Sequence, residues 1–180
     1  MTSSQFLESC LERNRDYLSR AVAAVQNLPL DRLNHRNVEG DWSPGQIFRH
    51  LILSNDPYMG PLTAAVKTLP VDPTNPPVQN TWFGRKLAEF AGPNKNVPAP
   101  KPFVPPEEPV TASVVQEWAS QQQKLIDFIE AARGRDINKK FMKNPVMKMF
   151  GMNMADCFLV LTEHTDRHVR QIEERSAGSC

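Results

Sequence analysis

The sequence has few cysteines, no long apolar run and almost no net charge. Its three cysteines, Cys10, Cys157 and Cys180, are odd in number and widely spaced, which argues against a disulfide framework. No stretch approaches the ~20 apolar residues that a membrane-spanning helix needs. Charged residues such as Glu8 and Arg13 interrupt the N-terminal region where a signal peptide would need an apolar core. We therefore expect a cytoplasmic protein with free thiols and no membrane partner.

The balance of charge argues against nucleic acid as a partner. Lysine and arginine total 21 against 20 for aspartate and glutamate, which gives a formal net charge of +1. Without an excess of either sign, the chain has no broad electrostatic field to attract a polyanion. The sequence also lacks a phosphate-cradling glycine loop, a nucleophile elbow and interleaved aromatic and basic residues. A small-molecule partner fits this composition better.

Helical periodicity dominates the sequence. A chain of 180 residues can bury roughly 70% of its unfolded surface in one core, and it is too short to expect two full domains. We therefore expect a single domain spanning 1–180. Apolar residues recur at helical spacing over 3–28, in the segment after Ser43, after a cap at Thr111 and after a cap at Asn153, and no segment alternates convincingly like a strand. These patterns predict an all-α chain folded as a four-helix bundle.

The second of these helices has the most complete start signal. Ser43 is suited to the cap, Pro44 to the first helical position, and Gln46 to the closing position of a capping box. Further along, Pro57 cannot donate a hydrogen bond to the carbonyl four residues earlier. We therefore expect a kink or an early end near residues 53–57.

A proline-rich segment separates the second and third helices. Eleven of the sixteen prolines lie between positions 70 and 110, so this segment cannot be regularly helical throughout. Trp82, Phe83, Leu87 and Phe90 make it too apolar for a free linker, and they indicate a short helix near 82–91. We expect 70–110 to form a long crossover that packs against the bundle, over the mouth of a pocket. So long a connection allows an up-down-down-up order of helices.

Three histidines fall where helices could bring them together. His164 and His168 are four residues apart, which places them one above the other on one helix face, and His50 lies on the apolar stripe of the second helix. The charged line of Glu163, Arg167, Arg170 and Glu174 belongs in water, so both C-terminal histidines should point inward. Neutral imidazoles are good ligands for borderline divalent metals.

The spacing alone leaves a less specific interpretation open. An inward histidine is often a core residue hydrogen-bonded to a backbone carbonyl, and a pair spaced by four is a weak motif. His35 lies in an aperiodic link beside Arg32 and Arg36, where a solvated loop residue is expected. Cys157 shares a face with His164, but a buried core thiol is its preferred interpretation. Gln171, one turn beyond His168, is a candidate partner for a ligand imidazole.

Two separated motifs carry a family resemblance. The segment from Trp42 to Leu51 (WSPGQIFRHL) and the segment from His164 to Ile172 (HTDRHVRQI) resemble the DinB/YfiT-like family of bacterial metalloproteins, as does the lead-in from Asn144 to Asp156 (NPVMKMFGMNMAD). The resemblance implies an up-down-down-up four-helix bundle with a metal site at His50, His164 and His168. It also implies a divalent ion, zinc or nickel, and a homodimer. The long proline-rich segment departs from the family pattern.

The function that the resemblance implies is thiol chemistry. Characterised relatives include transferases and isomerases that use bacillithiol, mycothiol or glutathione. We therefore expect a metal-dependent thiol S-transferase acting on a small electrophile, with a low-molecular-weight thiol as its co-substrate. Two alternatives stay open: a metal-dependent hydrolase that uses metal-bound water, and a non-catalytic metal- or ligand-binding stress-response protein. The sequence identifies no catalytic residue beyond the ligand set.

Overall fold

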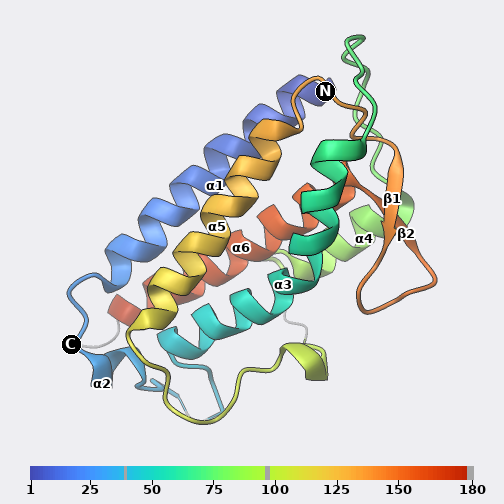
Figure 1. Ribbon diagram of the computed structural model, residues 1–180. Coiled ribbons are helices and arrows are strands. Elements are labelled where there is room, and N and C mark those ends of the chain that lie inside the picture. Colours follow the sequence, from blue (N-terminus) through green and yellow to red (C-terminus); the bar gives the residue numbers. More distant parts are fainter. Residues whose placement is uncertain (39, 96–97, 178–180) are drawn as a thin grey trace.

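The computed structural model describes residues 1–38, 40–95 and 98–177, and it is mostly helical (Figure 1). The prediction of an all-α chain is confirmed in this broad form, although a small two-stranded sheet is present as well. The elements are α1 Ser3–Val25, α2 Leu30–Leu33, α3 Pro44–Thr68, α4 Trp82–Ala91, the 3-10 helix η1 Lys101–Phe103, α5 Ser113–Ala131, β1 Lys140–Lys143, β2 Gly151–Asn153 and α6 Met154–Ala177.

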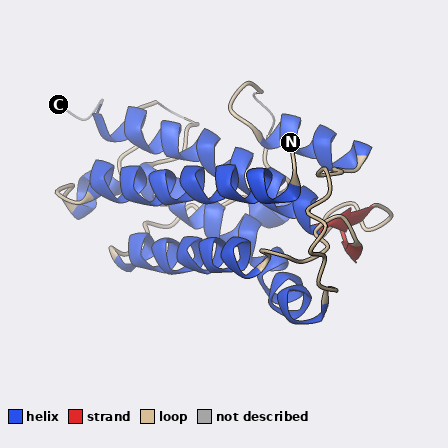
Figure 2. Cartoon of the chain, turned by 90° about the horizontal axis from the view of Figure 1, so that it is seen from above, coloured by secondary structure: helices blue, strands red, loops and turns tan. Residues whose placement is uncertain are grey.

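The four long helices α1, α3, α5 and α6 lie side by side, as both views show (Figures 1 and 2). Helix α6 packs against α1, α3 and α4, and α5 packs against α1 and α3. Their apolar faces enclose two clusters of buried side chains, one containing Leu11, Leu62 and Phe158 and the other containing Ile47 and Trp118. Each such side chain contributes roughly 1.5–3 kcal/mol through removal from water. Packing of amphipathic faces therefore holds the helices together.

Helix α3 begins as the sequence predicts. The Ser43 side chain accepts a hydrogen bond from the Gln46 backbone, the Gln46 side chain reaches back to the Ser43 backbone, and Pro44 is the first helical residue. The early end considered at residues 53–57 is wrong, because the helix continues to Thr68 with Pro57 and Pro61 inside it. Its axis instead changes direction between its teal and green halves (Figure 1). Buried side chains beyond the prolines, such as Leu62, hold the second half of the helix in place.

Two other predicted caps have different outcomes. Asn153 caps α6 as expected: its Oδ1 accepts from the Asp156 backbone N–H at 2.8 Å, and Asp156 Oδ2 accepts from the Asn153 N–H at 3.2 Å. Thr111 does not cap α5, which starts after Ala112 without a side-chain cap. The Thr111 hydroxyl pairs instead with the hydroxyl of Ser113 at 2.8 Å.

The small sheet lies in the connection between α5 and α6. Strands β1 and β2 pair antiparallel, with Met142 opposite Met152. Strands of four and three residues are too short for their alternation to stand out in a sequence, so the prediction of no strand is wrong here. Met152 is fully buried, which ties the sheet to the core.

Helix α4 is the short helix expected at 82–91, and it packs against α6. Its start is fixed by the buried carboxylate of Asp156, which accepts from the backbone N–H and the hydroxyl of Thr81, each at 2.8 Å. A Cβ placed on Gly84 would come within 2.1 Å of Asp156 Oδ1, so only glycine allows this approach. A network of hydrogen bonds therefore anchors the proline-rich segment to the N-terminus of α6.

Among the described residues, no helix combines the length and the apolarity that a bilayer span requires. Cys10 and Cys157 are free and buried, as expected for core thiols. Burial raises the pKa of the Cys10 thiol to about 11, so it stays protonated at neutral pH. Cys180 lies outside the described residues.

Candidate metal centre

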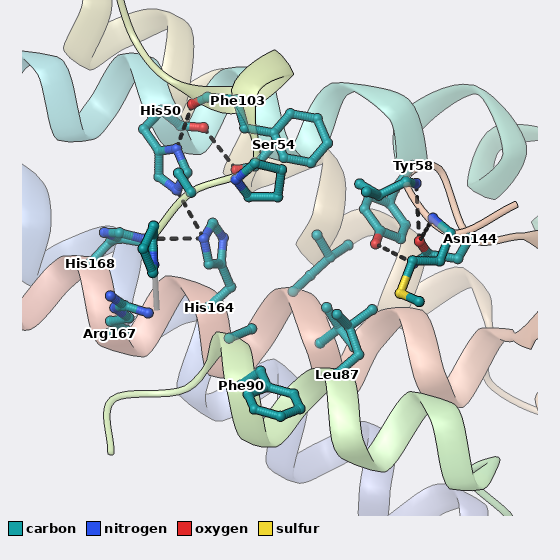
Figure 3. A pocket seen from close by; sticks show the side chains of 18 of the residues that line it. His50, Ser54, Tyr58, Leu87, Phe90, Phe103, Asn144, His164, Arg167 and His168 are labelled. Atoms are coloured by element: carbon teal, nitrogen blue, oxygen red, sulfur yellow. Dashed lines mark hydrogen bonds between the residues drawn. The ribbon is translucent and has the colours of Figure 1, made fainter. Parts of the chain in front are cut away.

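The structure brings His50, His164 and His168 together between α3 and α6 (Figure 3). The Nε2 atom of His164 lies 3.1 Å from His50 Nε2 and 3.0 Å from His168 Nε2. One ligand atom from each ring falls within a span of 4.8 Å. The spacing of four residues on α6 stacks two of the rings on one face, and the capped start of α3 sets the phase that turns His50 toward them.

The outward nitrogens of two rings are held by fixed acceptors. His50 Nδ1 donates to the carbonyl oxygen of Phe103 at 2.7 Å, and His168 Nδ1 donates to Gln171 Oε1 at 2.8 Å. A proton on Nδ1 leaves a lone pair on Nε2, directed at the centre of the trio. Gln171 is therefore placed as predicted, whereas the Phe103 carbonyl was not foreseen because a backbone group in η1 has no sequence signature.

The donor set suits a cation better than it suits hydrogen bonding within the trio. Each Nε2 offers one in-plane position, which holds either a proton or a lone pair. His164 Nε2 has two close neighbours, and it can make a good hydrogen bond with only one of them. A divalent ion would accept a lone pair from all three nitrogens. Three protein ligands with a further position open are typical of catalytic rather than structural zinc sites.

Burial keeps the three rings neutral. It lowers the pKa of His50 from 6.5 to about 4, and the positive charge of Arg167 acts in the same direction. Burial also places the pKa values of His164 and His168 well below the usual range, with further lowering from the neighbouring histidines and Arg167. Neutral imidazole is the form that binds metals, so these rings need lose no proton at pH 7.

The trio lies at one end of a cavity of about 260 Å³. The ring of Trp42 packs over the histidines, with its centroid 4.6 Å from that of His50 and 6.4 Å from that of His168. The wall is mostly apolar and comes from α3, α4, α6 and the segments around η1 and β1, including Tyr58, Leu87, Phe90, Phe103, Met147, Val160 and Leu161. The proline-rich segment thus supplies part of the pocket wall.

The charged line predicted on the last helix does not lie wholly in water. Arg167 is half-buried and lines the cavity, because it shares the inward side of α6 with His164. Glu163 is also half-buried, and it forms an ion pair with Arg13 of α1 at 2.7 Å. Arg170 is exposed, as expected. Helix α6 is covered by α1, α3 and α4, so little of its surface reaches solvent and part of the charged line is buried.

His35 and Cys157 do not belong to the site, as the sequence predicts. His35 is exposed and is not part of the trio. Cys157 belongs to the apolar core and does not line the cavity. Asn144 and Arg167 also line the cavity, and neither was predicted to do so. The sequence did offer a signal for Asn144, because it is the polar residue at the start of the family-like segment that precedes the last helix.

Comparison with known proteins identifies a family for the chain. A family model described as the DinB superfamily matches residues 11–172, which include all three histidines. Neither the curated proteins nor the solved structures that were compared gave a match. Since the matched region covers most of the chain, the chain belongs to the DinB superfamily.

Proposed function

We propose that this protein binds one divalent metal ion, zinc or nickel, through His50, His164 and His168, and that it is a metal-dependent thiol S-transferase. The observation that carries the proposal is the convergence of three neutral imidazoles at one end of a mostly apolar pocket. An ion held there would supply positive charge that lowers the pKa of a coordinated thiol or water. The substrates are a low-molecular-weight thiol and a small electrophile.

The surrounding residues support this chemistry by holding the site in one arrangement. The Phe103 carbonyl and the Gln171 side chain fix the ring orientation of His50 and His168 through their Nδ1 protons. The ring of Trp42 covers one side of the trio. The mostly apolar wall lowers the local dielectric constant, which strengthens electrostatic interactions within the pocket.

We also propose that residues 1–180 form a single domain. In it, a four-helix bundle in up-down-down-up order carries the site, and residues 70–110 form the crossover. The packing of the four long helices and the family membership support this arrangement. We also propose a cytoplasmic homodimer. Two free buried cysteines are in keeping with a reducing compartment, and the dimer rests on the family resemblance.

Metal binding is tested by titrating chelator-treated protein with Zn²⁺ and Ni²⁺ in a calorimeter. The proposal predicts one ion per chain for the wild type and loss of that site in His164→Ala and His168→Ala. His35→Ala is the matched control, because His35 is exposed and is not part of the trio; it should bind like the wild type. Equal binding by all four proteins would contradict the assigned ligands.

The reaction is tested by following thiol consumption with bacillithiol, mycothiol or glutathione and monochlorobimane as the electrophile. The proposal predicts a rate that requires the metal and falls to background in His168→Ala. Hydrolysis of an ester or amide without added thiol would indicate the hydrolase alternative instead. A metal-loaded protein inactive in both assays would favour a non-catalytic binding role.

A further inference from the structure

The cavity has a second polar end. Figure 3 shows Tyr58 and Asn144 at the side of the pocket opposite the three histidines. Both residues are buried, with 6% of Tyr58 and 2% of Asn144 exposed. Leu87 of α4 lies between the two ends (Figure 3), and Leu161 of α6 lines the same cavity. A molecule filling the cavity would therefore meet polar groups at its two ends and apolar side chains along its middle.

The hydrogen bonds at this end leave one donor for a ligand. Asn144 is fixed by its Oδ1, which accepts from the backbone N–H groups of Val146 at 3.0 Å and Met147 at 2.7 Å. Its Nδ2 then faces Tyr58 Oη at 3.4 Å, so the tyrosine oxygen is the acceptor in that contact. Within the described part of the chain, no hydrogen bond is formed by the Tyr58 O–H proton as a donor. Burial raises the pKa of this hydroxyl well above its usual range, which keeps the proton in place.

We propose that Tyr58 is the anchor of a ligand subsite, and that the ligand is a small neutral molecule, mostly apolar, with a hydrogen-bond acceptor such as a carbonyl oxygen at the end remote from the histidines. The acceptor would take the Tyr58 O–H bond, replacing a water that can occupy it in the free protein. The assignment of this ligand as the electrophilic substrate rests on the proposed function. The anchor itself requires no metal.

The dimensions of the cavity restrict the ligand further. His50 and Tyr58 are eight residues apart on α3, which corresponds to about 12 Å along a helix. A volume of about 260 Å³ lies below the range of roughly 300–1,000 Å³ that is usual for drug-sized ligands. A single aromatic ring with a short side chain fits these limits, which are those of the electrophile alone.

The test compares two probes of the same shape, benzylacetone and butylbenzene, of which only the first carries a carbonyl oxygen. Amide chemical shifts of the full chain report their affinities. Tyr58→Phe should lower the affinity for benzylacetone about five- to tenfold, which is the net effect of one hydrogen bond. The affinity for butylbenzene should not change. Tyr17→Phe is the matched control, since Tyr17 is the other tyrosine of the chain and bonds with Arg13 on α1; it should affect neither probe.

A second variant locates the probes independently of Tyr58. Leu87→Trp places a larger side chain from α4 in the cavity and should lower the affinity for both probes at least tenfold. Absence of benzylacetone binding to the wild type at millimolar concentration would overturn the proposal, and so would a ratio of the two affinities that Tyr58→Phe leaves unchanged. Titrations with chelator-treated and zinc-loaded protein separate the two proposals: preference for the ketone without any metal binding would refute the proposed function and support the subsite.

Discussion

Acid should destabilise the metal-free protein through its buried histidines. The pKa of His50 is about 4 in the folded chain against 6.5 for a free ring. Above pH 6.5 both states hold a neutral ring, so His50 has no effect on the free energy of unfolding there. As the pH falls through 6.5, the unfolded chain takes up a proton that the folded chain does not. Stability is therefore lost between about pH 6.5 and pH 4.

The expected loss is large relative to the stability of a typical domain. The difference between the two pKa values corresponds to about 3 kcal/mol when fully developed, and to about 2 kcal/mol at pH 5. The ring is 3% exposed, so solvent screening is small. His164 and His168 act in the same direction. For a chain of this size, 2 kcal/mol lowers the melting temperature by about 4–8 °C.

Urea unfolding of chelator-treated protein at pH 7.5 and pH 5 provides the measurement. Other groups also titrate in this range, so the informative quantity is the difference between variants. His50→Gln cannot take up the proton and should lose about 2 kcal/mol less than the wild type over this interval. His35→Gln, at an exposed position, should show the wild-type loss. Equal losses of stability in His50→Gln and the wild type would contradict the low pKa of the buried His50 ring.

Three further changes test the parts around the site. Gln171→Leu should weaken zinc binding about 10–100-fold in calorimetry, because His168 loses its Nδ1 partner, whereas Gln171→Glu should retain most of the affinity. Gly84→Ala should lower the free energy of unfolding by about 1–3 kcal/mol, because the added methyl meets Asp156; an unchanged melting temperature would contradict the close packing. Asn153→Ala should cost at least about 1 kcal/mol, because it removes the cap and also the Nδ2 bonds to the Gln79 and Asn138 carbonyls, and Thr111→Ala should cost less than about 0.5 kcal/mol. Equal losses in urea unfolding would contradict the cap assignments.

Local signals in the sequence predicted most of the helices. Where a prediction was wrong, packing between distant parts of the chain is the reason. The caps at Ser43 and Asn153 depend on residues three positions apart, so the sequence alone reveals them. Pro57 did not end α3, because burial of side chains further along the helix outweighs the hydrogen bond that the proline removes. The short strands β1 and β2 form because Met152 is buried, and burial of that kind depends on the complete fold.

The candidate site shows the same division. Helix phase predicted that His164 and His168 point inward, and the motif around His50 indicated its place beside them. The acceptor for His50 was not predictable, since the Phe103 carbonyl reaches it only after the proline-rich segment folds back over α3. Arg167 was wrongly assigned to water because helical periodicity does not reveal which sides of a helix its neighbours cover.

Anomalous diffraction from a crystal of the zinc-loaded protein would locate the ion relative to the three histidines. The proposed metal site predicts a single strong peak among the three histidines, with Nε2 of His50, His164 and His168 each about 2.0–2.1 Å from the ion. It also predicts that the Nδ1 bonds to Phe103 and Gln171 persist. Zinc bound at any other position, or an empty trio at saturating zinc, would contradict the assignment of this site.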